Sequence, residues 1–462
     1  MSRENPNPLP VSPKLQNPSS RNNQNNTPNV VNSSNPTEKK PLITRRKKKI
    51  GALTPLVLTP PPDEAIAAPS AMISELFSEP LSLKLITQLI ETGMLKCAGT
   101  GYTISFNARK IIFRKIEDLG EGQFGHVSSY HVSEEGSPDT AFIIAGKELI
   151  GEPADKRSEF KKTKIIQQMK IPGLIDIHAC TTEPSYLIFM EHSAQTLIAY
   201  LKEHNVAQNT NNTSVMQKLL DEVIQPLLDV IHNLNYNLTI FHLDIKVANV
   251  LLRAKKSEGT DTAIICDFGT FRTQEKINEK GLTGVGTFEL NSPERFGNTN
   301  AQDMSRDDIS KVTDSWALGL LIKKMLGLKT SSPEQDLEDS VFGREENFSE
   351  WSTHYSSIFT QYLIEQQENL TNFCDIAKTL NAIANCLLAP MSQRISVKDL
   401  LTPTGAVNLS VNWQERADQL ASSISTQEKP PVLSQSNLFG KLSLSTTTDT
   451  EKRSTMPTVL RS

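Results

Sequence analysis

The stretch that decides the fold is His242-Leu-Asp-Ile-Lys-Val-Ala-Asn249, which is followed by an apolar, strand-like run and then by Asp267-Phe268-Gly269. Two loops at the ends of a short hairpin lie side by side, so their side chains meet. This pair would bring together two carboxylates, a lysine and an amide. Carboxylate and amide oxygens suit a hard divalent cation, and a carboxylate can also accept a proton. The spacing therefore predicts one site to which both loops contribute.

The two loops resemble the catalytic loop and the metal-binding triplet of protein kinases. The resemblance implies that Asp244 accepts the proton of the substrate hydroxyl and that Lys246 steadies the γ-phosphate of ATP. It also implies that Asn249 and Asp267 bind Mg²⁺. Lys246 favours a serine or threonine acceptor, because tyrosine kinases usually lack a lysine there. The implied partners are ATP, Mg²⁺ and a protein substrate.

A segment upstream matches the glycine-rich loop of protein kinases. It contains Gly120, Glu121, Gly122, Gln123, Phe124, Gly125 and Val127, which the resemblance assigns to nucleotide binding. Glycines let the backbone approach phosphate oxygens that a Cβ atom would obstruct. Because Val127 continues into a strand, a dinucleotide-binding motif, which would open a helix, is disfavoured. About twenty residues later, Ala145 and Lys147 resemble the strand whose lysine contacts the nucleotide phosphates.

The helix after this strand departs from the family pattern. Kinases usually supply a glutamate from it to orient the lysine, and counting back from residues 169–174 places Lys162 at that position. A lysine facing Lys147 would repel it. Glu159 lies one helical turn earlier on roughly the same face and could be presented instead. The sequence leaves open whether Glu159 is this partner or a solvent-exposed residue.

A second departure is Leu243, which replaces the arginine that usually precedes the catalytic aspartate. In the family that arginine commonly receives the phosphate of an activation-loop residue. Without it, a phosphate on Thr283 or Thr287 would lack this charge partner. We therefore predict activity that does not require activation-loop phosphorylation.

Further residues fit the family as structural anchors or as part of the adenine pocket. The resemblance implies that His242 and Asp314 support the catalytic loop, that Thr287 bridges Asp244 and Lys246, and that Glu294 pairs with a buried Arg394. The pocket residues implied at and near the link between the lobes are Met190, Glu191, His192 and Leu251.

The rest of the chain indicates how the domain and its two tails are organised. Residues 1–70 are rich in Asn and Pro and are predicted to be disordered, with a basic segment at 39–49 that suits an acidic partner, anionic lipid or nuclear address. We expect a helical extension over 71–104, a kinase domain over 105–403 with its lobes meeting near 190, and a mostly disordered Ser/Thr-rich tail over 404–462. Residues 215–234 follow helical spacing, with a kink or break predicted at Pro226.

Composition excludes several classes of protein. A net charge of -4 argues against bulk nucleic-acid binding, and five scattered cysteines suit a reducing compartment. No stretch approaches the ~20 apolar residues of a membrane span. We expect a soluble protein in the cytosol or, given the basic segment, the nucleus.

Strand-like segments followed by helices predict an α+β, two-lobed kinase fold, and the resemblance covers about residues 111–402. The preferred interpretation is a eukaryotic-like serine/threonine protein kinase. Two alternatives stay open: a pseudokinase that serves as a binding scaffold, and a kinase-fold transferase with a non-protein acceptor or nucleotidyl chemistry. The Asn-rich start and Ser/Thr-rich tail also resemble effector kinases that intracellular bacterial pathogens deliver into the host cytosol.

Overall fold

The computed structural model describes residues 80–106, 109–122, 125–193, 195–254, 261–282, 285–287, 290–295, 304–328, 330 and 370–425. Residues 1–70 with the basic segment, Gln123, Phe124, Thr283 and the tail beyond residue 425 lie outside this range, so the expectations placed on them stay predictions. The described part of the tail expected over 404–462 contains a helix at Trp413–Ser425. No helix of the described part is both long and apolar enough to cross a membrane.

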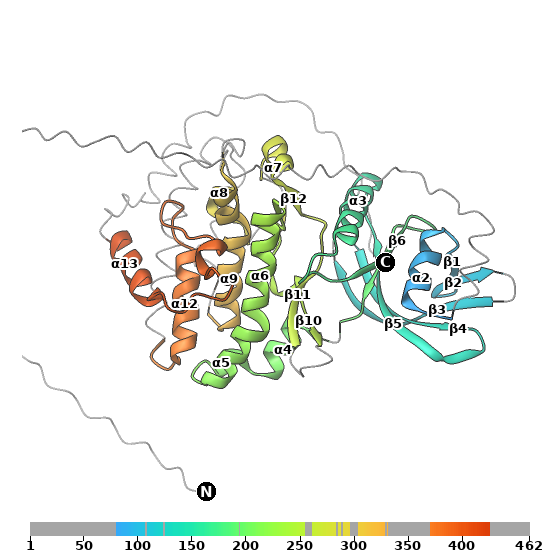
Figure 1. Cartoon of the computed structure of the whole chain (residues 1–462), viewed down its shortest axis with the longest axis horizontal. Coiled ribbons are helices and arrows are strands. Elements are labelled where there is room, and N and C mark those ends of the chain that lie inside the picture. The colour runs from blue at the N-terminus through green and yellow to red at the C-terminus, as the bar shows by residue number, and fades with distance from the viewer. Residues whose placement is uncertain are drawn as a thin grey trace, which may run out of the picture. The chain divides into compact units, whose positions relative to one another are not determined.

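The N-terminal lobe is an antiparallel sheet with the strand order β1-β2-β3-β4-β5-β7-β6. The strands are β1 (Lys96–Ala98), β2 (Gly101–Phe106), β3 (Arg109–Gly122), β4 (Gly125–Glu134), β5 (Ser137–Leu149), β6 (Ile177–Thr181) and β7 (Leu187–Glu191). Helix α3 (Pro153–Met169) connects β5 to β6 and lies beside the sheet (Figure 1). The predicted small antiparallel sheet is therefore confirmed.

Helix α2 (Leu83–Glu91) covers part of this sheet. Ser82 caps its first turn by accepting a hydrogen bond from the Leu85 amide at 3.2 Å. The apolar face of α2, which includes Leu89, packs with Phe113 and Phe189 of the sheet in one buried cluster. The helical extension expected over 71–104 is helical only over Leu83–Glu91 in its described part. Its last residues form β1 and β2 instead, because Lys96–Ala98 pairs with Gly101–Thr103 as a hairpin.

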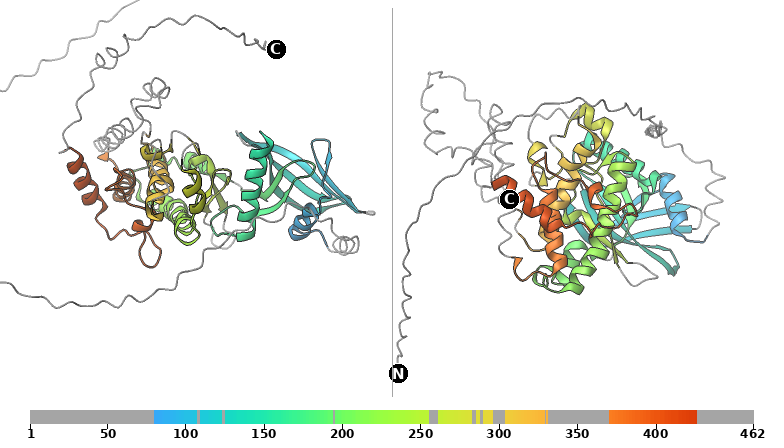
Figure 2. Two further views of the ribbon diagram at one scale, coloured as in Figure 1. Left: turned by 90° about the horizontal axis from the view of Figure 1, so that it is seen from above. Right: turned by 60° about the vertical axis from the view of Figure 1, so that its left-hand side comes forward.

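The C-terminal lobe is mainly helical (Figures 1 and 2). Its described α-helices are α4 (Leu197–Glu203), α5 (Thr213–Leu219), α6 (Gln225–His232), α7 (Gln274–Lys280), α8 (Arg306–Ser310), α9 (Trp316–Met325), α12 (Asp375–Leu387) and α13 (Trp413–Ser425). A wide π-helical turn, Leu220–Ile224, joins α5 to α6 just before Pro226. The backbone stays helical from Thr213 to Asn237, so the kink or break predicted at Pro226 takes the form of a change from π-helix to α-helix just before a residue that cannot donate a backbone hydrogen bond. The predicted α+β, two-lobed fold is confirmed.

Short strands of the C-terminal lobe place the deciding loops together. Strand β10 (Val250–Ala254) pairs antiparallel with β11 (Asp261–Ile265), with Val250 opposite Ile265. The catalytic loop ends where β10 begins, and the triplet starts just after β11. The Cys266 amide donates to the Asn249 carbonyl at 2.9 Å, which closes this end of the hairpin.

The loop after α3 fastens the two lobes together. The Ile175 amide donates to the Ile265 carbonyl, and the Ile265 amide donates to the Gly173 carbonyl, both at 2.9 Å. Strand β11 therefore holds the loop that follows α3. This contact positions α3 relative to the triplet at residues 267–269.

Candidate active site

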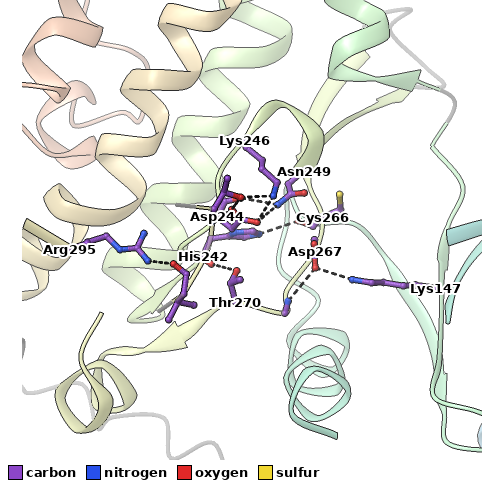
Figure 3. A network of polar contacts seen from close by, with 12 residues as sticks. Lys147, His242, Asp244, Lys246, Asn249, Cys266, Asp267, Thr270 and Arg295 are labelled. Atoms are coloured by element: carbon purple, nitrogen blue, oxygen red, sulfur yellow. Dashed lines mark hydrogen bonds and ion pairs between the residues drawn. The ribbon is translucent and has the colours of Figure 1, made fainter. Parts of the chain in front are cut away.

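The two deciding loops bring Asp244 and Asp267 to one region, and Lys147 reaches Asp267 from the N-terminal lobe (Figure 3). Leu243 has a φ of 68° and Asp267 a φ of 67°. These are left-handed backbone conformations, which residues other than glycine rarely adopt. Such residues persist where their surroundings hold them, and they cluster at functional sites. The contacts of both loops show what holds them here.

Asp244 is the centre of the first cluster. Thr287 donates to its Oδ1 from the amide at 3.0 Å and from Oγ1 at 2.7 Å. Lys246 Nζ lies 2.9 Å from its Oδ2 and 2.7 Å from Thr287 Oγ1. Burial works against the charge on Asp244, but the hydrogen bonds from Thr287 and Lys246 outweigh it, so its pKa lies below the ordinary value. Thr287 thus bridges Asp244 and Lys246 as expected from the family pattern.

Asp314 supports the catalytic loop from below. Its carboxylate is completely buried and accepts the amides of His242 at 2.8 Å and Leu243 at 2.9 Å. Burial raises its pKa, although these amides and His242 oppose the shift. The His242 carbonyl also accepts a 2.9 Å hydrogen bond from Thr270 Oγ1, which ties the loop to the segment after the triplet.

Lys147 is the centre of the second cluster, which spans both lobes. Its Nζ lies 2.7 Å from Glu159 Oε1 and 3.1 Å from Asp267 Oδ1. Burial disfavours its charge, but the carboxylates of Asp267 and Glu159 prevail and raise its pKa. Burial raises the pKa of Glu159 above its ordinary value, although Lys147 opposes the shift. Asp267 stays below its ordinary pKa because Lys147 outweighs the effect of burial.

The count that placed Lys162 opposite Lys147 was wrong, because the structure presents Glu159 to Lys147. Lys162 lies one turn further along α3 and donates to the Gly269 carbonyl at 2.5 Å. The expected repulsion between the two lysines is therefore avoided. Burial, with a smaller effect from Arg272, lowers the pKa of Lys162 to about 8.

The glycine-rich segment joins β3 to β4, with Gly120 opposite Val127, Glu121 opposite His126, and Gly122 opposite Gly125. Lys147 lies opposite Val127 on the next strand. A Cβ atom on Gly125 would lie 2.6 Å from the Glu148 carbonyl oxygen and 3.1 Å from Lys147 Cε, so only glycine fits there without displacement. Glycine at this position lets β4 lie against the stem of Lys147.

The residues expected at the link between the lobes lie on adjoining strands. Ala145 of β5 is opposite Met190 of β7, and Leu251 of β10 is opposite Thr196 of the short strand β8 (Gln195–Thr196). His192 follows directly after β7. These positions leave Ala145, Met190 and Leu251 on strands that flank the connection between the lobes.

The Glu191 side chain is engaged elsewhere. Its carboxylate accepts hydrogen bonds from Arg253 Nε at 2.9 and 3.1 Å and from the Asp176 amide at 3.2 Å. The Glu191 amide also donates to the Asp176 carbonyl at 2.9 Å, so this residue ties the end of β7 to Arg253 and Asp176. Sequence reasoning missed Arg253, because a lone arginine at the end of an apolar strand gives no signal of its partner.

The end of the activation segment is anchored by an ion pair. Arg394 donates to both Glu294 carboxylate oxygens at 2.9 Å, and its guanidinium lies 4.5 Å from the Trp316 ring centroid. Arg394 is buried. The structure thus brings together Glu294 and Arg394, which the resemblance had paired.

Leu243 and Arg295 hold the middle of this segment. Leu243 is buried in a cluster with Leu282, and Val285 packs against the same cluster. The Arg295 guanidinium donates to the Val285 carbonyl at 2.6 Å and to the Leu282 carbonyl at 3.4 Å. Burial lowers the pKa of Arg295 to about 10, although Asp314 and Asp244 favour its charge. Sequence reasoning also missed Arg295, because its contacts form only when the activation segment folds back on itself.

The candidate metal ligands fit a hard divalent cation. Asn249 donates from Nδ2 to the Asp244 backbone oxygen at 2.9 Å and to Asp244 Oδ2 at 3.0 Å, so a cation would take its amide oxygen. Asp267 offers a carboxylate. The described residues contain no group of three or more His, Cys, Asp or Glu side chains placed to hold a metal. Two oxygen ligands suit Mg²⁺, which usually keeps waters and substrate phosphates in its remaining positions.

Comparison with known proteins identifies the family. Residues 113–404 match the protein kinase domain, close to the range of 111–402 over which the sequence resembles that family. The chain therefore belongs to the protein kinase family, a class that uses ATP and divalent metal ions.

Individual relatives are distant. The chain is 25% identical over 245 residues, 53% of this chain, to the mitogen-activated protein kinase kinase kinase dlk-1 of Caenorhabditis briggsae, and 25% identical over 179 residues, 38% of this chain, to dlk-1 of Caenorhabditis elegans. These matches span only 24% and 17% of those two relatives. It is 24% identical over 324 residues to serine/threonine-protein kinase 17A of Oryctolagus cuniculus, which covers 68% of this chain and 74% of that protein.

Proposed function

We propose that this protein is a protein serine/threonine kinase that transfers the γ-phosphate of ATP to a protein hydroxyl and uses Mg²⁺. The observation that carries the proposal is that both polar clusters are assembled at once: Lys147 pairs with Glu159 and Asp267 while Lys246 and Thr287 bond Asp244. A scaffold that only binds nucleotide has no need of the cluster around Asp244. The relative named as a serine/threonine kinase supports the choice of acceptor.

The chemistry follows from the residues around Asp244. Its low pKa makes its carboxylate a weak base, so it would orient the acceptor hydroxyl and take its proton late in the reaction. Lys246 Nζ, which touches both Asp244 and Thr287, would place a cation beside the transferring group. Glu159 would keep Lys147 directed at the nucleotide phosphates. Mg²⁺, when held by Asn249 and Asp267, would supply further positive charge to the phosphate oxygens.

We also propose that activity is independent of activation-loop phosphorylation. The segment is held by apolar contact with Leu243 and by hydrogen bonds from the Arg295 guanidinium to the Leu282 and Val285 carbonyls. These contacts serve in place of the usual arginine and phosphate. Phosphatase-treated protein should therefore keep its activity. The proposal fails if that protein is inactive and recovers only when Thr283 or Thr287 is phosphorylated.

The proposed reaction is tested with purified full-length protein, Mg²⁺, a generic basic protein and ATP labelled in either the γ- or the α-phosphate. We expect γ-label on serine or threonine, and a loss of about 100-fold or more in Lys147→Ala and Asp267→Ala. Nucleotide binding without transfer in the wild type would indicate a pseudokinase. Transfer of α-label would indicate nucleotidyl chemistry.

Other expectations stay predictions of the sequence. These are delivery into a host cell, a cytosolic or nuclear location, and binding of the basic segment at 39–49, which lies outside the described part, to an acidic partner or anionic lipid. The protein substrate follows from the proposed activity and carries a serine or threonine hydroxyl.

A further inference from the structure

Lys162 was a departure from the family pattern in the sequence, and in the structure it contacts the triplet. Glu159 and Lys162 lie three residues apart on α3, so they share one face of the helix. Glu159 reaches Lys147, while Lys162 Nζ donates to the Gly269 carbonyl at 2.5 Å. Lys162 Nζ also lies 5.7 Å from the centroid of the Phe271 ring. One turn of α3 therefore touches the triplet through two different charged groups.

Gly269 brings the helix and the triplet into direct contact. A Cβ atom at this position would lie 3.1 Å from Glu159 Oε2 and 3.3 Å from Glu159 Cδ. The Glu159 carboxylate thus packs on the Gly269 backbone while Lys162 binds the carbonyl of the same residue. Outward movement of α3 would break both contacts together with the Lys147 ion pair.

The Lys162 contact also acts on a strained turn. Asp267 holds a φ of 67°, and Gly269 is two residues further on. A strained backbone persists only when surrounding contacts hold it. Lys162 restrains the turn from the side of α3, whereas Lys147 restrains it from the side of β5.

The burial of Lys162 must be compensated. Desolvation and the neighbouring cations Arg272 and Lys280 disfavour its charge, and the carboxylates Glu159 and Asp267 favour it. The carbonyl and the aromatic ring supply the close contacts that a partly buried ammonium needs. A lysine that served only for solubility would extend into water.

We propose that Lys162 is a positioning residue, which ties α3 to the Gly269 carbonyl and so keeps Glu159 on Lys147 and Asp267 turned toward the site. The inference rests on the proposed kinase function. In this proposal Lys162 does not contact the substrate.

The test compares Lys162→Met, which keeps an apolar stem, with Lys162→Arg, which keeps a cationic donor. Lys156→Met is the matched control, because it removes the same charge from the same helix. We expect Lys162→Met to lower kcat about tenfold with little change in the KM for ATP, and Lys162→Arg to recover most of the loss. Lys156→Met should resemble the wild type.

A second measurement separates positioning from stability. Amide hydrogen exchange should become faster in α3 and in residues 267–272 of Lys162→Met, with the melting temperature close to that of Lys156→Met. If Lys162→Met does not fold, Lys162→Gln takes its place, with a smaller loss of kcat expected. Wild-type kcat and wild-type exchange in the folded Lys162 variants would overturn the inference.

The two proposals fail in different ways. A wild-type protein that transfers no phosphate would contradict the proposed function, and the exchange measurement would still report whether Lys162 holds α3. An active wild type whose Lys162→Met variant matches Lys156→Met in both measurements would contradict only the role of Lys162.

Discussion

At the scale of single residues, Thr287 links the groups around Asp244. Its hydroxyl donates to Asp244 Oδ1 and accepts from Lys246, so it fixes the relative position of the proposed base and the lysine. The hydrogen bond from its backbone amide to Asp244 does not depend on the side chain. The hydroxyl and the amide can therefore be separated by substitution.

Thr287→Val keeps the shape of the side chain and removes the hydroxyl. We expect kcat to fall about tenfold, since two hydrogen bonds to charged groups are lost, while nucleotide affinity stays close to that of the wild type. Thr287→Ser keeps the hydroxyl and should retain most of the activity. Equal activities in the Val and Ser variants, measured at saturating ATP, would contradict this role.

At the scale of elements, a buried lysine lies between two helices of the C-terminal lobe. Lys323 of α9 is 1% exposed and donates to Asn381 of α12 at 2.7 Å. Burial lowers its pKa to about 7, whereas a lysine in an unfolded chain has a pKa of about 10.4. Between these values the unfolded chain binds a proton that the folded chain does not. The free energy of unfolding therefore rises with pH across this window.

Lys323→Met should remove this contribution to the pH dependence. Its free energy of unfolding, followed by urea titration from pH 6 to 10, should rise less with pH than that of the wild type. The exposed neighbour Lys324 provides the control, because Lys324→Met should keep the wild-type slope. A Lys323→Met protein with the wild-type slope would show that this lysine does not titrate in the window.

At the scale of the whole molecule, Arg253 connects the lobes. It belongs to β10 of the C-terminal lobe and binds Glu191 at the end of β7. It also donates to the Leu174 carbonyl at 3.1 Å in the loop after α3. Its bonds therefore join the helical lobe to two connections of the sheet lobe.

Arg253→Met should loosen this link. We expect the KM for ATP to rise by about three- to tenfold with a smaller effect on kcat, because the proposed adenine pocket lies where the lobes meet. Arg253→Lys keeps the charge but cannot donate two parallel hydrogen bonds. Its KM for ATP should lie between those of the wild type and Arg253→Met. Steady-state kinetics with varied ATP checks the prediction, and unchanged constants in Arg253→Met would refute it.

How much the sequence could predict depends on the distance between the interacting residues. The catalytic loop and the triplet are contiguous motifs, so the sequence alone predicts the candidate site around Asp244 and Asp267. Glu159 and Lys162 were harder, because the facing residue depends on the rotation of α3 and no local signal reports it. Arg253 and Arg295 make contacts set by the folded loops, so their partners could not be predicted.

The cover formed by α2 over the sheet has a consequence for where this domain can be cut. The family match begins at residue 113, whereas α2, β1 and β2 lie before it and complete the N-terminal lobe. A protein shortened to the family match would leave β3 as an open edge and uncover apolar side chains such as Phe189. An unpaired edge beside an uncovered apolar face is a template for aggregation.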